Sequence, residues 1–428
     1  MASRFSPLGA ARRSFVSLRS RNYRLFFIGQ LVSNTGNWLT MVALTLLVLG
    51  LTHSGLNIGL LTACQFGPIL LLSPFAGLVA DRVDKRRLLT VTQSLEMAQS
   101  FVLAALAFQP HPPLGALYAV AAVGGVLLAF DNPVRRSFVS EMVREEDVPN
   151  AVTLYSALVA TSRIIGPTLA GALVVTVGYG WAFTLDGLSY LTVLVAIAMM
   201  RPSELRPSEA APRAKHQVRD GFRYVRQMPE LRISFVMLAV IGVLSYNFSV
   251  TFPLLVTRSL GGSDATYTFV YSAFSVGSLV GALVVAHRGD VSFRQIVLGA
   301  AGLGLAMGML AVVPSPLAAL PVAVVLGLAS IAYMTATTAL VQVISIPSMH
   351  GRVLALQTVL MIGTTPLGGP LLGWIADNWG ARIPVVIGAL GALGAALYGW
   401  WAGGSLGRGE ADRSLPAPEP EEIPTGWA

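Results

Sequence analysis

Long apolar runs, separated only by short charged or turn-forming segments, fill most of this chain. Residues 39–51, 114–130 and 191–200 contain almost no group that water would stabilise. Hydrophobic residues make up 54% of the sequence and charged residues only 12%, a balance outside the range of soluble globular domains. Because a run of ~20 apolar residues crosses a bilayer as a helix, the sequence predicts an all-α integral membrane protein that is embedded in a lipid bilayer.

The apolar runs predict twelve membrane-spanning helices. The positions of lysine and arginine indicate how these helices are oriented. With both termini in the cytoplasm, Arg163, Arg258 and Arg382 are the exceptions among 29 basic residues that otherwise fall on the inner side. This asymmetry is typical of a multi-pass protein of the plasma (inner) membrane. It also accounts for the net charge of +8, so no nucleic-acid partner is expected.

The spans divide into two halves around the longest polar interruption. We predict a six-helix bundle in residues 1–200, a cytoplasmic linker in 201–232, a second six-helix bundle in 233–402 and a disordered cytoplasmic tail in 403–428. In the linker, Val218, Phe222 and Val225 recur at helical spacing among arginines. This pattern favours a short helix along the inner membrane surface, and an unstructured solvated linker is the alternative.

One short segment between the second and third spans carries an unusual density of charge. It combines a glycine-rich helix end, an acidic residue at the boundary and a basic cluster, which are Gly77, Asp81, Arg82, Lys85, Arg86 and Arg87. Such a pattern describes a tight turn at a membrane face. Residues 77–89 therefore form a candidate gate.

Residues 77–87 resemble the signature loop between helices two and three of the major facilitator superfamily. Residues 165–171 resemble the glycine-proline motif of its antiporter branches, and residues 20–26 and 131–136 resemble the branch that holds the enterobactin and macrolide exporters. The resemblance implies twelve transmembrane helices in two six-helix bundles that rock about a central site. It also implies that Asp81 and Arg82 form an inner gate latch. The corresponding loop at 281–290 lacks the helix-end acid, so a weaker second gate is expected.

Polar residues inside spans are candidates for a substrate pathway. In the first span, Gln30, Ser33, Asn34 and Asn37 fall on one helical stripe beside Trp38. The predicted counterparts in the seventh span are Tyr246, Asn247 and Thr251. Interhelical hydrogen bonding without a ligand is the alternative for the whole set, and lipid contact is the alternative for Trp38.

Charged residues inside spans also mark candidate sites, because they are costly there. Arg163 stays ionised and needs a carboxylate or a wet cavity, and Glu96 and Asp131 are the candidate partners at the nearest depth. Glu96 is expected either to exchange protons as a cavity alternates sides or to be a fixed counter-ion for the signature loop. Asp131 is expected to close the fourth span at the inner surface. Asp186, near the outer surface, is expected to act more as a helix-end partner than as a proton carrier.

Glycines and prolines recur at matched places in the two halves. Gly166, Pro167 and Gly171 in the fifth span correspond to Pro366 and Pro370 in the eleventh, and proline removes a backbone hydrogen bond and bends a helix. Small residues four apart, as in Gly55/Gly59 and Gly369/Gly373, let helices approach closely. Bends at matched places favour a gate, and packing without motion is the alternative.

Enzymatic chemistry has little support in the sequence. No phosphate-binding loop of the Gly-x-x-x-x-Gly-Lys-Ser/Thr kind is present, and the five histidines lack metal-ligand spacing, so no cofactor or metal is expected. The working hypothesis is a monomeric secondary active exporter that moves an amphipathic small molecule, drug-like or siderophore-like, with protons as the coupling ion. The rivals are an uptake or facilitated-diffusion carrier of the same fold and a non-transporting receptor or scaffold.

Overall fold

The structure is a computed structural model, and it describes residues 15–80, 82–206, 217–286 and 292–410. Helices joined by short turns account for nearly all of them, and no strand occurs in these ranges. Eleven of the helices are long and apolar enough to cross a membrane. A further helix of 23 residues, α4 (Lys85–Ala107), runs alongside them and is less apolar because of its basic start and its buried polar residues. Together with α4, the eleven apolar spans make the twelve helices that the sequence predicted.

The first bundle contains α2 to α7. Their bounds are α2 (Arg21–Thr52), α3 (Gly55–Ala80), α4 (Lys85–Ala107), α5 (Leu114–Glu141), α6 (Val148–Thr176) and α7 (Tyr179–Met199). Side-chain caps set two of the starts: Ser20 precedes α2 and accepts from the Tyr23 N–H, and Asp84 precedes α4 and accepts from the Arg87 N–H.

The second bundle has one interrupted span. Its helices are α9 (Pro229–Leu244), α10 (Phe248–Leu254) with a π-helical turn (Leu255–Ser259), α11 (Asp264–Ala286), α12 (Phe293–Val312), α13 (Pro316–Ile344), α14 (Pro347–Trp379) and α15 (Ile383–Glu410). The seventh span, which the sequence predicted as one helix, breaks between α9 and α10. The Asn247 side chain donates to the carbonyls of Gly242 and Val243, at 3.3 and 2.8 Å, and so satisfies backbone groups that the break leaves open.

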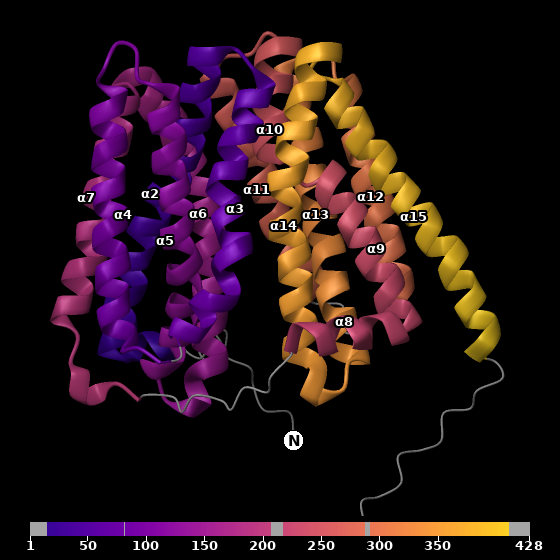
Figure 1. Cartoon of the computed structure of the whole chain (residues 1–428), viewed down its shortest axis with the longest axis horizontal. Helices are drawn as coiled ribbons and strands as arrows, with labels where there is room; N and C mark the ends of the chain where they lie inside the picture. The colour runs from indigo at the N-terminus through magenta and orange to yellow at the C-terminus, as the bar shows by residue number, and fades with distance from the viewer. Residues whose placement is uncertain (1–14, 81, 207–216, 287–291, 411–428) are drawn as a thin grey trace, which may run out of the picture.

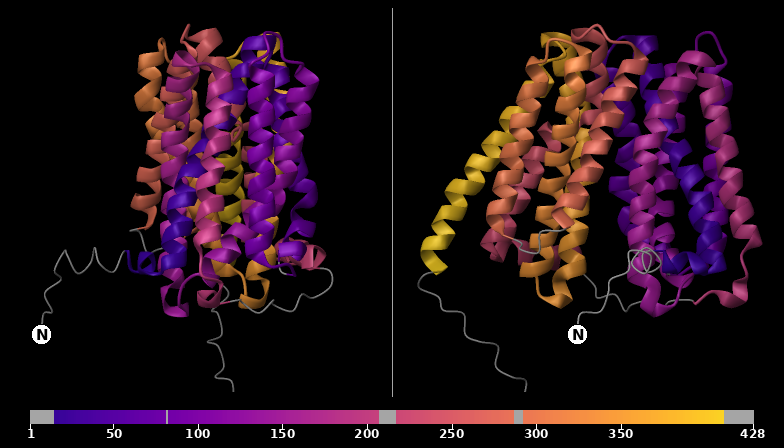
Figure 2. Two further views of the ribbon diagram at one scale, coloured as in Figure 1. Left: turned by 90° about the vertical axis from the view of Figure 1, so that its left-hand side faces the viewer. Right: turned by 180° about the vertical axis from the view of Figure 1, so that it is seen from behind.

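The two bundles repeat one packing scheme. They stand side by side in Figure 1 and in the right view of Figure 2, and the left view of Figure 2 looks at the first bundle with the second behind it. In the first bundle α2 packs on α6 and α7, and α4 packs on α5 and α7. In the second, α9 packs on α14 and α15, and α12 packs on α13 and α15. Two helix pairs join the bundles, α3 with α14 and α6 with α11. Each pair joins the second helix of one bundle to the fifth helix of the other, as an internal repeat requires.

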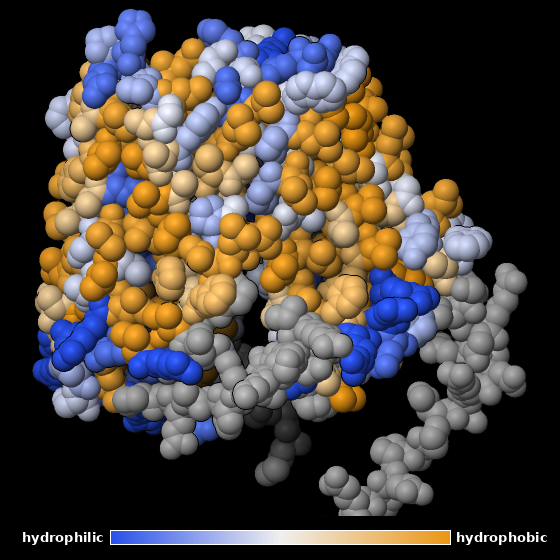
Figure 3. Space-filling model, in the orientation of Figure 1, coloured by the Kyte–Doolittle hydropathy of each residue, from blue (hydrophilic) through white to orange (hydrophobic). Residues whose placement is uncertain are grey.

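The two ends of the bundles differ in charge. We call the end where α4 starts with Lys85, Arg86 and Arg87 the basic end, and the end where α3 starts the far end. Hydrophobic residues cover the middle of the molecule, and hydrophilic residues gather at both ends (Figure 3). A short helix, α8 (Gln217–Gln227), lies across the basic end beneath the second bundle (Figure 1). Its Val225 is buried against Val341 and Val353, whereas Phe222 is exposed.

Two helices end later than the sequence predicted. The last helix, α15, continues past residue 402 to Glu410, and no proline interrupts the chain between Pro384 and Pro416. The fourth span, α5, continues past residue 132 to Glu141 with Pro133 inside it. A membrane-embedded chain stays helical at such a proline because open backbone groups in lipid are more costly than one missing hydrogen bond. This second extension decides the chemistry of the site.

Candidate functional site

A cluster of charged side chains is buried inside the first bundle. Asp131 and Arg135 lie one turn apart on α5 and form an ion pair. Glu96 of α4 approaches the same guanidinium, with 3.9 Å between Oε2 and Nη2. All three side chains are at most 4% exposed. The cluster thus holds two carboxyl groups around one arginine at the middle of the bundle.

Amides and a hydroxyl complete the polar contacts of this cluster. The Gln93 amide donates to Glu96 at 2.8 Å and to Asp131 at 3.0 Å, and Thr92 donates to Asp131 at 2.8 Å. On the other side, Arg135 donates to the Asn34 oxygen at 3.2 Å, and Asn34 donates to Gln30 at 3.0 Å. Part of the polar stripe predicted on the first span is therefore occupied by contacts within the bundle. Ser33 is buried on the same helix.

These contacts correct the predicted partner of Arg163. Their similar depth in the membrane had suggested Glu96 and Asp131 as partners of Arg163. Both carboxyl groups pair with Arg135 instead. Arg135 had been counted among the basic residues on the inner side, beyond the fourth span that Asp131 was expected to close. The longer α5 carries it into the bundle and places it at i+4 from Asp131, the spacing at which helical side chains meet. Asp131 accordingly does not close a helix but lies within one.

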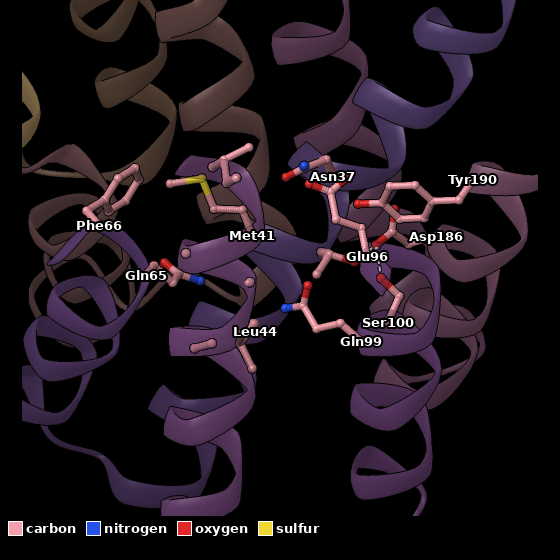
Figure 4. Close-up of a pocket in the computed structure, with 15 residues that line it drawn as sticks. Asn37, Met41, Leu44, Gln65, Phe66, Glu96, Gln99, Ser100, Asp186 and Tyr190 are labelled. Atoms are coloured by element: carbon pink, nitrogen blue, oxygen red, sulfur yellow. Dashed lines mark hydrogen bonds between the residues drawn. The ribbon is translucent and has the colours of Figure 1, made fainter. Parts of the chain in front are cut away.

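Next to the cluster is a small open cavity of about 80 Å³, lined by α2, α3, α4, α5 and α7 of the first bundle (Figure 4). Asn37, Glu96 and Asp186 lie together on its wall, with the ring of Tyr190 beside them. The cavity also exposes the amides of two glutamines, Gln65 and Gln99. Glu96 therefore touches both the buried arginine and this polar space.

Asp186 is held by hydroxyl groups. Its carboxyl accepts from Thr40 at 2.7 Å and Ser100 at 2.8 Å, and Ser189 lies at 3.5 Å. In the described part of the chain it forms no ion pair. The prediction of a helix-end partner was wrong, because these donors come from the interiors of α2, α4 and α7 and the residue is 1% exposed. Hydroxyl groups can donate to a carboxylate and also accept from a carboxylic acid, so this site accommodates either protonation state.

Arg163 of α6 lies where the two bundles meet. Its guanidinium carbon is 5.1 Å from the ring centre of Trp38 on α2, and it lies close enough to Tyr246 of the second bundle for an electrostatic interaction. The predicted pathway residues Asn247 and Thr251 are buried and bond to backbone carbonyls at the break between α9 and α10. They support that break rather than line a pathway.

Glycines form the contact between α3 and α14. A side chain at Gly59 would meet the backbone of Gly369 and Pro370, and one at Gly55 would meet the carbonyl of Gly373. The two small-residue pairs seen in the sequence thus face each other across the bundles, as a small-xxx-small contact requires. We call this contact the glycine seam.

The second contact between the bundles also uses predicted residues. Gly171 of α6 packs directly against Thr268 of α11, and Thr168 shares a 2.7 Å hydrogen bond with Ser272. Gly166 packs on α2 at Trp38, and Pro167 is buried beside it. Pro366 and Pro370 lie within α14, and Pro370 faces the glycine seam. Of the predicted bend residues, Gly171 and Pro370 therefore lie where the bundles touch, whereas Gly166 packs within the first bundle.

At the far end, Asp377 of α14 joins the two bundles. Its carboxylate accepts from the backbone N–H groups of Gly55 at 2.7 Å and Leu56 at 2.9 Å, and from the Ser54 hydroxyl at 2.8 Å. It therefore caps the start of α3, where an acidic group is favoured. Arg258 pairs with Asp377 at 2.8 Å and also donates to the carbonyl of His53, in the turn before α3. We call this set the far-end latch.

The far-end latch was not predicted from the sequence. Arg258 had been noted only as an exception to the charge asymmetry, and Asp377 had not been singled out. One sequence signal could have indicated it. Asp377 lies near the end of α14, much as Asp81 of the signature loop lies at the end of α3. In the described residues, every hydrogen bond or ion pair between the bundles lies at mid-depth or toward the far end.

Replacing Asp377 by alanine is expected to open the far end. The change removes the cap of α3 and the partner of Arg258, and hydrogen bonds to charged groups contribute about 1.5–3 kcal/mol each when buried and less at a partly exposed site. Spin labels at Val177 and Leu317, both exposed at the far end, would report a new population at longer distance when Cys64 is replaced by serine. Asp264→Asn, which weakens one 3.1 Å bond from Tyr179, is the milder control. An unchanged distance distribution for Asp377→Ala would refute the latch.

The signature loop makes its described contacts within the first bundle. Lys85 pairs with Glu141 at the end of α5, Arg86 donates to the Ile197 carbonyl at 3.0 Å, and Arg82 is exposed. Because Lys85 uses Glu141, Glu96 is not the counter-ion of this loop. Gly77 is helical, and Asp81 lies outside the described residues, as do residues 287–290 of the corresponding loop at 281–290. The latch predicted for Asp81 therefore stays a prediction.

Comparisons with known proteins agree with this architecture. Residues 12–418 match the protein family described as transmembrane secretion effector. The staphyloferrin A transporter of Staphylococcus aureus (strain NCTC 8325 / PS 47) is 24% identical over 61% of this chain and 66% of its own length, so the match spans slightly less than two thirds of that relative. The macrolide efflux protein A of Streptococcus pyogenes is 22% identical over 84% of this chain and 92% of its own length. The enterobactin exporter of Shigella flexneri is 23% identical over 82% of this chain and 84% of its own length.

A solved structure supports the fold independently. The crystal structure of a bacterial homologue of the human lysosomal transporter Spinster, inward-facing and unoccupied, superposes with a TM-score of 0.74 at 16% identity. The superposition covers 93% of this chain and 99% of that one. The superposition and the family match over residues 12–418 both agree with the resemblance found in the sequence motifs. The chain belongs to the transmembrane secretion effector family, within the major facilitator superfamily of membrane transporters.

Proposed function

We propose that this protein is a secondary active exporter that moves an amphipathic small molecule out of the cell by alternating access. The two moving units would be the bundles in residues 1–200 and 233–402, joined by the linker at 201–232. The observation that carries the proposal is the distribution of contacts between the bundles, which hold the far end together through Asp377. Among the described residues, the bonds between the bundles lie toward the far end or at mid-depth, an arrangement suited to loading from the basic end.

The proposed orientation places the basic end in the cytoplasm of a prokaryotic cell. Lys85, Arg86 and Arg87 lie at this end, and so do the starts of α2 and α9. Basic residues beside spans favour the cytoplasmic side of a plasma (inner) membrane, which puts both termini there. One chain supplies both bundles and both contact surfaces, so we propose that the monomer is the transporting unit. Loading from the cytoplasm then corresponds to export.

Protons are the proposed coupling ion, carried by Glu96 and Asp186. In the described part of the chain, the first bundle buries four carboxyl groups. Glu141 pairs with Lys85 near the basic end, and the other three, Glu96, Asp131 and Asp186, share one buried arginine. A buried carboxylate without its own cation is costly, and binding a proton removes that cost. Both Glu96 and Asp186 line the cavity, so a proton can reach them when the cavity is open to water. Asp131 pairs directly with Arg135 and is proposed to stay charged.

A comparison of a deletion strain with its parent tests the function. Export predicts that the deletion strain becomes more susceptible to some toxic compounds or accumulates a metabolite inside the cell. Lower accumulation of a compound in the deletion strain would instead indicate uptake or facilitated diffusion. Purified protein that moves no compound found in that screen when placed in vesicles would indicate a receptor or scaffold.

Glu96→Gln and Asp186→Asn are expected to uncouple transport from the proton gradient. Each amide keeps the shape of the side chain but cannot release a proton, so accumulation against a gradient is expected to fall by more than about tenfold, equivalent to ~1.4 kcal/mol. Exchange of substrate across the vesicle membrane without a gradient should continue. Glu145→Gln, an exposed acid outside the cavity, is the matched control. Full uncoupler-sensitive accumulation by both variants would exclude this pair as the proton carriers.

A further inference from the structure

Arg163 has no acidic partner in the described part of the chain. Glu96, Asp131 and Asp186 in the first bundle bond to Arg135 or to hydroxyl groups, Glu141 pairs with Lys85, and Asp377 bonds to Arg258 at the far end. The Arg163 side chain is partly buried, and its Nε atom is buried without a hydrogen-bond acceptor. An arginine in a membrane protein keeps its charge and is costly without compensation. Its guanidinium therefore has donors that the described residues do not use.

The surroundings of Arg163 belong to both bundles. Trp38 of α2 covers one face of the guanidinium, and α11 reaches the neighbouring turn of α6, where Ser272 contacts the Ile164 carbonyl. Tyr246 approaches from the second bundle. Counted at ~1.5 Å per residue from the starts of their helices, Trp38, Arg163 and Tyr246 lie at similar depths of roughly 22–25 Å. They meet at mid-depth between the bundles.

The second bundle contributes a fixed aromatic wall at this place. Tyr246 stacks on Tyr333, with ring centres 6.4 Å apart, and meets Phe248 edge to face at 5.8 Å. Its hydroxyl donates to the Ser330 carbonyl at 2.7 Å, which holds the ring in place. Tyr246 also lies in the break between α9 and α10, and interrupted helices at the midplane are where transporters of several folds bind their substrates.

We propose that Arg163 is an anion-binding residue of the substrate site, and that the protein selects amphipathic anions with a flat apolar body. This inference rests on the proposed function and names its substrate class. A carboxylate, sulfonate or similar group would accept from the free guanidinium donors and supply the missing charge compensation. The flat body would lie between Trp38 and Tyr246, since aromatic rings bind apolar surfaces in offset or edge-to-face contact.

A binding measurement with two dyes of one ring system tests the proposal. Fluorescein is an anion and rhodamine 123 is a cation built on the same three-ring core, and the binding of each to the purified full-length protein can be followed by fluorescence anisotropy. Wild-type protein is expected to bind fluorescein more tightly than rhodamine 123. Arg163→Gln is expected to weaken fluorescein binding by about tenfold or more, equivalent to ~1.4 kcal/mol, and to leave rhodamine 123 binding unchanged or stronger.

Three further variants separate recognition from structural support. Arg163→Lys keeps the charge without the planar fork and should retain part of the preference for the anion. Trp38→Phe keeps a ring and should weaken both dyes by a similar factor. Arg136→Gln removes an exposed arginine and should change neither. If Arg163→Gln does not fold, the ratio of the two dissociation constants in Arg163→Lys decides, because a purely structural role would leave that ratio at its wild-type value.

The outcomes distinguish this proposal from the proposed export. Wild-type protein that binds fluorescein no more tightly than rhodamine 123, or an Arg163→Gln protein with an unchanged ratio, would overturn the anion site. Export by the protein in the deletion-strain comparison would stand in either case. Conversely, Arg163-dependent binding of fluorescein by a protein that moves nothing in vesicles would overturn export and leave the anion site intact.

Discussion

Replacing Arg135 by glutamine is expected to destabilise the protein more than any other single change considered above. Arg135 compensates Asp131 directly and Glu96 at 3.9 Å, and all three side chains are buried. Removing one partner of a buried ion pair leaves an uncompensated charge and costs about 3–5 kcal/mol. The variant should therefore melt at a lower temperature in detergent and reach the membrane in smaller amounts, as measured by thermal unfolding and by quantitative immunoblotting.

Neutralising the facing acid provides the decisive comparison. In the double variant Arg135→Gln with Asp131→Asn, the directly paired carboxylate is neutral, and Glu96, the more distant one, can take up a proton, so most of the lost stability should return. Arg136→Gln, the exposed neighbour on the same helix, should melt like the wild type. If the double variant is no more stable than Arg135→Gln alone, the loss does not arise from charge compensation and the role assigned to Arg135 is wrong.

The second large effect is expected at the glycine seam, where Gly59→Val should stop transport. The added side chain would meet the backbone of Gly369 and Pro370 on α14, which cannot rotate away as a side chain can. Overpacking of this kind costs about 1–3 kcal/mol, enough to shift an equilibrium between two conformations by about 5- to 150-fold. The far-end-closed state should become less populated, and export of whatever compound the deletion-strain comparison identifies should fall accordingly.

Gly67 on the same helix offers a matched control. A side chain there would meet nothing within 4 Å, so Gly67→Val should transport normally even though it makes the same change in the same helix. Spin-label distances at the far end, measured as for Asp377→Ala, should lengthen in Gly59→Val and stay unchanged in Gly67→Val. Equal behaviour of the two valine variants would show that the seam does not control the conformation.

Several features of the fold followed from local sequence signals. The apolar runs predicted the helices, and the two halves reproduce one packing scheme. The pairs Gly55/Gly59 and Gly369/Gly373 were recognised as close-contact motifs, and the structure brings them against each other. These predictions held because hydrophobic length and small-residue spacing are properties of single helices, which a reader of the sequence can assess without knowing their neighbours.

Side-chain partners were harder to predict. Asp131 was expected to close the fourth span, yet α5 continues to Glu141 and carries Arg135 into the bundle. Arg163 was matched with Glu96 and Asp131 by depth alone, whereas the rotation of each helix directs those carboxyl groups to Arg135. Depth along a helix axis can be counted from the sequence. The direction in which a side chain points depends on which neighbours the whole bundle packs against it.

By itself, the sequence determined the class of protein, its two-part helical organisation and the charge asymmetry of its ends, because these depend on transfer free energies that add along the chain. Only the tertiary structure decided which charges meet. It paired Asp131 and Glu96 with Arg135, surrounded Asp186 with hydroxyl groups and joined the bundles through Asp377. It also placed Arg163 beside Trp38, where no acid of the described ranges reaches it. Each of these contacts joins groups from different helices or depends on where a helix ends, and both follow from the packing of the whole molecule rather than from any one segment.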